Sequence, residues 1–460
     1  MATNNLLPSN WVITKLGEVC ITTSGGTPSR KVPKYFGGNI PWVKSGELDK
    51  GLILDTDERI SEEAIQDSSA KIFPKGTLLI ALYGATVGKL AFLGIDAASN
   101  QAVCGIYKSG FIESNFLYHF LFFRKNKLVS QSIGGAQPNI SQAILKDLDF
   151  PLPPLPEQHR IVSKIEQLFT DLDKGIEYLK TAQQQLKVYR QAVLKWAFEG
   201  RLTNENVVDG ELPKGWFWKA IEDVADISTG VTPLRTDKSF WENGTIPWIT
   251  SGALNDTFVY KAEEFVTQKA FDETTLKLLP KHTLLLALYG EGKTRGKCSE
   301  LMFESTTNQA IAGIKLKKEF EQSRNFLKWF LLKNYQDIRL LSAGGVQPNL
   351  NSTIVKKTPF PFPSRNEQTK IVKEIESRLS VCDKIEEIIE TSLLQAEALR
   401  LSILKKAFEG KLVKQNPTDE PAQKLLEKIR AEMKKNAPGI QEKEVKIKPL
   451  KRKLNKHERK

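Results

Sequence analysis

The sequence predicts an α+β protein in which two mixed α/β domains are joined by two long helices that form an antiparallel coiled coil, with a pseudo-twofold internal repeat. Three observations predict this fold class. A long helical pattern occurs twice, about 210 positions apart; the segments before the two patterns share short strings of residues; and proline-rich joins separate globular from helical segments. A period of this length indicates duplicated domains rather than a solenoid.

The joins give the expected domain boundaries. Proline suits the start of a helix and disfavours helix on its upstream side, so each long helix should begin within the strings FPLPPLPEQ (150–158) and FPFPSRNEQ (360–368). The expected parts are a first domain at 1–155, a first long helix at 156–203, a linker at 204–215, a second domain at 216–363, a second long helix at 364–413 and a basic tail at 414–460.

The first globular segment alternates short apolar runs with Gly, Ser and Pro, which predicts short strands and loops. The run that ends at Gly84 predicts a buried strand, and SNFLYHFLFFRKNKL predicts a helix packed on the strands. The second segment repeats these features. The shared strings are Thr27-Pro28 with Thr232-Pro233, Ile40-Pro41-Trp42 with Ile246-Pro247-Trp248, Ser45-Gly46 with Ser251-Gly252, 76–84 with 282–290, Asn100-Gln101-Ala102 with Asn308-Gln309-Ala310, and 134–140 with 344–350.

The first long helix should extend from about Gln158 to Gly200, because this stretch lacks proline and its apolar residues recur at three- and four-residue steps. At about 1.5 Å per residue such a helix is roughly 65 Å long. A second copy extends from Asn366 to Leu412, and the two apolar seams can bury each other. The expected seams are Ile161, Ile165, Leu168, Leu172, Ile176, Leu179, Leu186, Tyr189, Val193 and Trp196, and Ile375, Leu379, Cys382, Ile385, Ile389, Leu393, Ala396, Leu399 and Ile403.

The tail divides into two parts. PTDEPAQKLLEKIRAEMKK predicts a helix capped by Asp, whereas the strongly basic remainder is typical of a disordered tail or a non-specific phosphate contact.

Composition limits the function classes. The formal net charge of +13 and the pI near 9.3 indicate an anionic partner, either nucleic acid or a membrane surface. No apolar run reaches the roughly 18 residues of a membrane span, and the N-terminus does not resemble a signal sequence, so we expect a cytoplasmic protein. Cys20, Cys104, Cys298 and Cys382 have no zinc-site spacing, and the four histidines are scattered, so no metal site is expected.

Antiparallel pairing of the helices would relate two similar but non-identical globular domains by a pseudo-twofold axis. Parallel pairing would require the chain to travel back the full helix length through a short linker. Two readers held by a scaffold suit two half-sites on duplex DNA.

The shared strings, the order of domain and helix, and the helix that ends in KxAFEGxL resemble the specificity subunits of Type I restriction-modification systems over residues 8–450. The resemblance implies two target recognition domains that each read half of a bipartite double-stranded DNA site, with the helices setting the gap. It implies two methyltransferase subunits and restriction subunits as partners. S-adenosylmethionine, ATP and Mg would belong to those partners, and the protein would be bacterial or archaeal and nucleoid-associated.

Catalytic motifs are missing from the sequence. No Asn/Asp-Pro-Pro-Phe/Tyr motif of adenine methyltransferases occurs, and the only Asn-Pro is Asn416-Pro417. The stretch from Gly84 to Leu90 is one residue too short for a phosphate-binding loop and ends in Leu instead of Ser or Thr. We therefore expect no enzyme activity in this chain. The rival interpretations are a self-contained methyltransferase or nuclease, and a coiled-coil tether that links two protein-binding modules.

Residues that differ between the repeats are the better candidates for reading bases, because two readers of different half-sites should differ where they read. Arg and Lys donate to guanine or phosphate. The predicted DNA-binding residues are Arg30, Lys31, Lys34, Lys44, Tyr83 and Lys89 in the first domain, and Arg235, Lys238, Tyr289, Lys293, Arg295 and Lys297 in the second. The alternatives are solvated surface charges for the cations and core packing for Tyr83 and Tyr289.

Shared residues have a different expected role. Trp42 and Trp248 should hold the common fold, and the Gln-Pro-Asn strings should form turns. Phe198 and Phe408, at the ends of the long helices, are expected to be exposed aromatic anchors for a protein partner.

Overall fold

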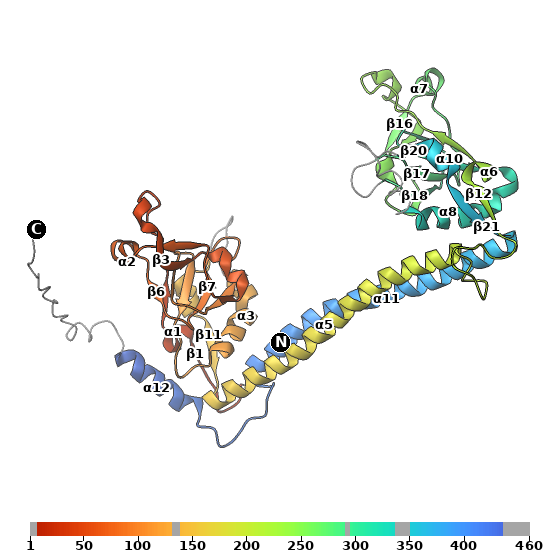
Figure 1. The fold of residues 1–460 in the computed structure, drawn as a ribbon. Helices are drawn as coiled ribbons and strands as arrows, with labels where there is room; N and C mark the ends of the chain where they lie inside the picture. The colour runs from red at the N-terminus through yellow and green to blue at the C-terminus, as the bar shows by residue number, and fades with distance from the viewer. Residues whose placement is uncertain (1–6, 131–138, 290–294, 336–349, 436–460) are drawn as a thin grey trace, which may run out of the picture. The chain divides into compact units, whose positions relative to one another are not determined.

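The computed structural model describes residues 7–130, 139–289, 295–335 and 350–435. The chain divides into two compact units, unit 1 (Met1–Glu177 and Leu393–Lys460) and unit 2 (Tyr178–Ser392). Two long helices, α5 (Leu155–Phe198) and α11 (Arg365–Phe408), each contribute residues to both units (Figure 1). The predicted order of globular segment and long helix, repeated once, is therefore confirmed.

Unit 1 is built on two sheets and a short ribbon. The five-stranded sheet has the order β2 (Thr22–Ser24), β10 (Val103–Ile106), β7 (Leu78–Ala81), β8 (Leu90–Leu93), β4 (Leu52–Ile53), and the four-stranded sheet β5 (Glu58–Ile60), β3 (Phe36–Val43), β9 (Ala97–Ser99), β6 (Ile72–Phe73). The ribbon pairs β1 (Val12–Lys15) with β11 (Asp149–Leu152). The helices are α1 (Leu16–Val19), η1 (Pro33–Tyr35), η2 (Ser45–Lys50), α2 (Glu62–Asp67), α3 (Ser114–Ser130), α4 (Gln142–Lys146) and α12 (Ala422–Lys435).

Unit 2 repeats this plan. Its five-stranded sheet has the order β13 (Ala225–Thr229), β20 (Ile311–Leu316), β17 (Leu284–Ala287), β18 (Cys298–Leu301), β15 (Phe258–Val259). The second sheet is β16 (Glu264–Val266), β14 (Ile246–Ile249), β19 (Thr306–Thr307), and the ribbon is β12 (Phe217–Ala220) with β21 (Pro359–Phe362). The helices are α6 (Ile221–Val224), η3 (Lys238–Phe240), η4 (Ser251–Ala253), α7 (Gln268–Glu273), η5 (Lys318–Ser323), α8 (Arg324–Lys333) and α10 (Ser352–Lys357).

The shared strings build the shared core. All four residues of β7 and of β17 are buried, as predicted for the apolar run before each Tyr-Gly. Trp42 and Trp248 are 2% exposed, and their indole N–H groups donate to the backbone oxygens of Gly26 and Val231. These tryptophans anchor the loop after the first strand of each five-stranded sheet, so the prediction that they hold the fold is confirmed.

The long helices pair antiparallel within each unit. In unit 2, Arg190 of α5 contacts Asp383 of α11 at 2.6 Å. In unit 1, the same pair recurs with the helices exchanged, because Arg400 of α11 contacts Asp173 of α5. Residue 173 of α5 thus pairs with residue 400 of α11, and residue 190 pairs with residue 383. The residue numbers rise along α5 in the direction in which they fall along α11, so the helices are antiparallel. In the two units together, α11 buries Ile375, Cys382, Ile389, Ala396 and Ile403 at seven-residue steps, which is the spacing of a coiled-coil seam.

Part of the expected seam was wrong. Tyr189 and Trp196 of α5, and Ile385 and Leu399 of α11, are exposed rather than buried against the partner helix. The three- and four-residue steps admit several apolar stripes on one helix, and contact with a single partner helix buries only one of them.

The glutamate of the shared Glu-Gln pair at the start of each long helix binds segments of the chain that are distant in sequence. In unit 1, Glu157 accepts hydrogen bonds from Trp11 Nε1 (3.0 Å) and from Gln415 Nε2 (2.7 Å), so it ties α5 to the segment that follows α11. In unit 2, Glu367 accepts one from Asn204 Nδ2 (2.7 Å) and ties α11 to the segment that follows α5. Each glutamate therefore closes a unit whose parts are far apart in sequence.

The first part of the basic tail forms the predicted helix, α12. Leu425, Leu426 and Ile429 of α12 belong to the core of unit 1. Arg430 pairs with Glu18 at 2.5 Å, and Arg160 pairs with Asp419 at 2.5 Å. The part of the tail after 435 lies outside the described residues.

Candidate nucleic-acid interface

Loops from four strands meet at one end of the sheets in unit 1. The amide of Asn100, after β9, donates to Val43 of β3, and the amide of Leu82, after β7, donates to Ala102. Gln101 N donates to Thr27 Oγ1 in the loop after β2. We call this place the loop edge, since the ends of β2, β3, β7 and β9 all reach it.

The same loop edge exists in unit 2. Asn308 N donates to Ile249, Leu288 N donates to Ala310, and Thr232 contacts Gln309 through their side chains. The edge depends on a glycine after the first strand of the sheet. A Cβ on Gly230 would lie 1.9 Å from the backbone oxygen of Thr307, so no larger residue fits this close approach.

Two predicted arginines stack in the same way in the two units. The Arg30 guanidinium lies 4.3 Å from the ring centroid of Phe36 and pairs with Glu58 at 2.7 Å. In unit 2, Arg235 lies 3.9 Å from the Trp241 centroid and pairs with Glu264. Because the arrangement is common to both repeats, it supports the fold of each loop. A DNA contact by either arginine stays a prediction.

The remaining predicted cations next to these loops are accessible. Lys44 shares Glu58 with Arg30, at 3.0 Å, and these two cations lower the pKa of Glu58 below its usual value. Lys31 is exposed in the loop before η1, and Lys34 is exposed in η1. Lys238 is exposed on η3 and approaches Glu242 at 3.4 Å.

The tyrosines and lysines of the turn after β7 and β17 lie at the loop edge. Tyr83 is half-buried, and burial raises its pKa despite a hydrogen bond with Gln101. Tyr289 is half-buried at the equivalent position. Lys89 pairs with Asp49 at 2.5 Å, and Lys297 donates to Asn255 Oδ1 at 2.9 Å. The structure therefore brings Tyr83 with Lys89, and Tyr289 with Lys297, to one edge of each unit.

Two predictions fall wholly or partly outside the part of the chain that the structure describes. Lys293 is not among the described residues, and neither is Gln137 or the second Gln-Pro-Asn string. Asn139 is described, and it forms a bridge with Tyr83. Arg295 is half-buried and is the first described residue after Tyr289.

The predicted exposure of Phe198 and Phe408 was wrong. Both side chains are 5% exposed. Phe408 packs on Phe116 and Phe120 at ring-centroid distances of 5.3 Å, and Phe198 packs on Phe326 at 5.1 Å. Each phenylalanine joins the end of a long helix to a globular core, so neither is available as an anchor for a protein partner.

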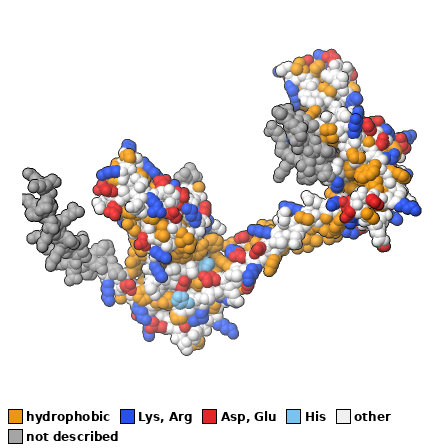
Figure 2. Space-filling model, in the orientation of Figure 1, with side chains coloured by type: hydrophobic (Ala, Val, Ile, Leu, Met, Phe, Trp, Pro, Cys, Tyr) orange, Lys and Arg blue, Asp and Glu red, His pale blue; other side chains and the backbone are white. Residues whose placement is uncertain are grey.

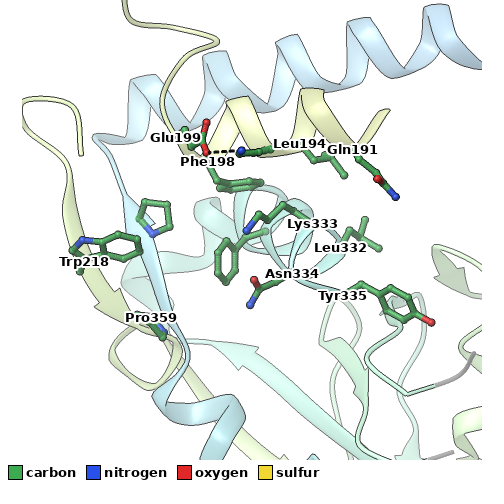
Figure 3. A pocket seen from close by; sticks show the side chains of 13 residues that line it. Gln191, Leu194, Phe198, Glu199, Trp218, Leu332, Lys333, Asn334, Tyr335 and Pro359 are labelled. Carbon is green, nitrogen blue, oxygen red and sulfur yellow. Dashed lines mark ion pairs between the residues drawn. The ribbon is translucent and has the colours of Figure 1, made fainter. Parts of the chain in front are cut away.

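A pocket of about 710 Å³ opens beside Phe198 in unit 2 (Figure 3). Leu194, Phe330 and Trp218 contribute apolar walls, and Lys195 pairs with Glu199 at 3.7 Å on its rim. In unit 1 the ring of Phe123 stacks on Phe408 at 5.6 Å. Lys333 occupies the position in α8 that Phe123 has in α3, so no ring covers Phe198 from this position.

Residues that the sequence did not single out complete the loop edges. They are Asp49, Asn255, Gln101 and Gln309, all exposed at the edge. A signal for two of them was present, because the Asn-Gln-Ala string is shared. Asp49 and Asn255 follow the shared Ser-Gly at the same distance but differ in charge, which is the kind of difference expected between two readers.

The described residues contain no group of His, Cys, Asp and Glu that could hold a metal ion. Burial raises the pKa of Cys20 and Cys298 to about 12, so these thiols are not nucleophiles at neutral pH. Within the same part of the chain, no helix has the length and apolar character that crossing a bilayer requires.

Known proteins resemble this chain over most of its length. The family described as "Type I restriction modification DNA specificity domain" matches twice, at residues 8–186 and 213–395. The StySPI specificity subunit of Salmonella potsdam and the EcoKI specificity subunit of Escherichia coli K12 are each 26% identical, over 93% of this chain and 96% of their own. The MjaIX specificity subunit of Methanocaldococcus jannaschii is 27% identical over 67% of this chain and 73% of its own.

Solved structures have the same fold. The HsdS subunit from Thermoanaerobacter tengcongensis superposes with a TM-score of 0.61 at 20% identity, over 88% of this chain and 98% of that one. A chain from a solved type I restriction-modification system, studied for its assembly and conformational transition, has a TM-score of 0.67 at 20% identity, over 88% of this chain and 100% of its own. With both halves of the sequence matched, this chain belongs to the family of Type I restriction-modification DNA specificity subunits.

Proposed function

We propose that this chain is the DNA recognition subunit of a Type I restriction-modification complex, in which each unit reads one half of a bipartite duplex site. The observation that carries the proposal is the pair of loop edges. Each edge gathers a lysine, a tyrosine and a glutamine that both units share, and next to them lie residues that differ, among them Asp49 in unit 1 and Asn255 in unit 2. A common scaffold with different loops suits two readers of different half-sites.

The charge of the chain supports binding to DNA. The net charge is +13, and on the face drawn in Figure 2 the Lys and Arg side chains are spread over both units. Cations that neutralise phosphates give affinity that is independent of sequence, while base edges give specificity.

The long helices set the gap between the half-sites in this proposal, and they also bind the two modification subunits. Apolar side chains remain exposed on both helices (Figure 2). Val188, Val381 and Ile388 are 60%, 55% and 62% exposed in unit 2, and Leu394 is 74% exposed in unit 1. Large exposed apolar residues on a paired helix are suited to contact with further helices.

The chain itself performs no chemistry in this proposal. Methylation of adenine and ATP-dependent cleavage belong to the modification and restriction subunits, together with S-adenosylmethionine, ATP and Mg. The relatives that match this chain are specificity subunits, which supports this division of labour.

The test is to co-express the full chain with the modification subunit encoded beside it and to map methylated adenines in the host DNA at single-base resolution. We expect a split motif with two defined halves and a fixed gap. Exchanging residues 216–355 for those of a relative should change one half of the motif only.

A single continuous motif, or no methylation in spite of a stable complex, would reject the proposal of two readers. The rival function is a coiled-coil tether that links two protein-binding modules. That rival predicts no salt-dependent binding of the complex to duplex DNA, whereas a DNA reader loses affinity steeply as salt rises.

A further inference from the structure

Two lysines occupy the same place at the two loop edges. Lys89 follows Gly88, and Lys297 follows Gly296; both glycines have a positive φ, of 76° and 81°. The carbonyl of Lys89 accepts a hydrogen bond from Ala81 N at 2.9 Å, and that of Lys297 accepts one from Ala287 N at 3.0 Å. The backbone therefore places Lys89 and Lys297 at equivalent positions, each paired with the last residue of the central strand.

The residues that hold these ammonium groups are also equivalent. Asp49 and Asn255 each come four positions after the shared serine, Ser45 or Ser251. Each directly follows a leucine that is 1% exposed. Lys89 Nζ lies 2.5 Å from Asp49 Oδ2, and Lys297 Nζ lies 2.9 Å from Asn255 Oδ1. The two units thus share one lysine contact and differ in the group that accepts it.

This difference changes the electrostatics of the edge. The Lys89–Asp49 pair has no net charge, and the Asp49 side chain is 63% exposed, so it presents a carboxylate to an approaching duplex. The Lys297–Asn255 pair keeps the whole positive charge of the ammonium group. A carboxylate only accepts hydrogen bonds, whereas an ammonium group only donates them.

We call the Lys89–Asp49 pair the Lys89 corner and the Lys297–Asn255 pair the Lys297 corner. Base edges in the major groove complement these two corners differently. Cytosine N4 and adenine N6 donate hydrogen bonds, and a carboxylate can accept them. Guanine O6 and N7 accept hydrogen bonds and attract a cation, which a carboxylate at the same point repels. One lysine position can therefore favour different bases in the two units, depending on its acceptor.

We propose that Asp49 and Asn255 are specificity-determining residues of the two readers. Asp49 directs the Lys89 corner of unit 1 to a base with an exocyclic amino group, and Asn255 leaves the Lys297 corner of unit 2 cationic and directs it to guanine. The inference rests on the proposed function, because it assumes that each loop edge reads a half-site.

The experiment uses the full chain in complex with its modification subunit and maps methylated adenines for Asp49→Asn, Asn255→Asp and the unchanged protein. We expect D49N to change the preferred base at one position of one half-site, by about tenfold in the relative methylation of the two bases. N255D should change one position of the other half-site. Asp147→Asn is the matched control. Asp147 is an exposed carboxylate that lies outside the loop edge and pairs with Lys15 Nζ at a distance of 3.2 Å. Its loss should leave the motif unchanged.

The inference is overturned if D49N and N255D keep the motif of the unchanged protein. It is also overturned if they lower methylation equally at all sites, because residues that contact only phosphates affect all sequences alike. Asp49→Ser removes the carboxylate in a second way and should reproduce the change of base, so a folding defect of one variant does not decide the result. If the unchanged complex itself shows no bipartite motif, the proposed function fails and this inference fails with it.

Discussion

Single residues show how two units with one fold diverge in their interiors. In unit 2, buried Glu300 lies 3.1 Å from Lys328 Nζ and 2.9 Å from His282 Nδ1. In unit 1, Phe92 stands at the position of Glu300 and Tyr118 at the position of Lys328. The rings of Phe92 and Tyr118 stack with centroids 5.6 Å apart. Burial alone would raise the pKa of Glu300, but hydrogen bonds from His282 and Lys328 bring it below its usual value.

Replacing Lys328 with Ala should destabilise unit 2. The change removes one of the two permanent cations beside the buried Glu300 carboxylate and leaves Arg324 Nε at 3.2 Å, which costs up to about 3 kcal/mol in the free energy of unfolding. The double variant Glu300→Phe with Lys328→Tyr, which transplants the pair of unit 1, should recover most of this loss. Hydrogen exchange of the β18 amides measures the effect in unit 2 alone. A double variant no more stable than K328A would show that the two pairs are not interchangeable.

His119 gives unit 1 a dependence on pH. The ring packs against Phe169 at 5.7 Å, and burial lowers the pKa of His119 from 6.5 to about 4. The unfolded chain therefore binds a proton at a higher pH than the folded one. Stability that is fully present above pH 6.5 should be lost as the pH falls to about 4, by up to about 3 kcal/mol.

Urea unfolding of unit 1 at pH 7 and pH 4.5, followed by hydrogen exchange of α3, checks this prediction. The variant His119→Leu should lose less stability between the two pH values than the unchanged protein does. His159→Leu, at an exposed position, serves as the control. An equal loss in the unchanged protein and in H119L would assign the acid sensitivity to other groups.

Among the elements, α12 has no counterpart in the linker between α5 and β12. It lies beside Ile21 and Tyr107 of unit 1, and Ile21 stays 47% exposed. In unit 2, the equivalent strand positions hold exposed Asp226 and Lys315, which face each other across β13 and β20. Unit 2 therefore has charged side chains where α12 borders apolar ones in unit 1, and α12 buries its own Leu425, Leu426 and Ile429 in the core of unit 1.

The packing of α12 predicts that the C-terminal segment stabilises the N-terminal domain. Leu426 is 2% exposed, so Leu426→Ala should lower the free energy of unfolding of unit 1 by about 2–5 kcal/mol. Glu427→Ala, at the exposed neighbouring position of the same helix, should change it little. Thermal unfolding of the two variants side by side is the measurement. Equal stability of L426A and E427A would show that α12 is not part of the core of unit 1.

At the scale of the whole molecule, the repeat could be recognised from the sequence. The strings that recur are the ones that form the shared core and the starts of the long helices. Trp42 and Trp248, the apolar strands β7 and β17, and the Glu-Gln pairs each occupy the same place in both units. The positions of Phe198 and Phe408 were misjudged for a related reason. A helix end looks exposed in sequence, but here each end is buried by aromatic residues of α8 or α3 that are distant along the chain.

The loop edges could be predicted only in part. Lys89, Lys297, Tyr83 and Tyr289 were found from the turn that follows a shared strand, but their partners were not, because Asp49 lies 40 positions before Lys89 and Asn255 lies 42 before Lys297. Likewise, the sequence could not show that Arg30 and Arg235 stack on aromatic rings and pair with glutamates. Such contacts depend on which loops the sheets bring together.

The sequence by itself determined the number of domains, the two long helices and the family, since these depend on periodicity and on recurring strings that are local in the chain. Only the tertiary structure decided which apolar stripe of each helix is buried, which lysine has a charged or a neutral partner, and which unit requires the C-terminal helix. These features arise from contacts between segments distant in sequence, where burial and charge pairing are set by the packing of the whole unit rather than by local pattern.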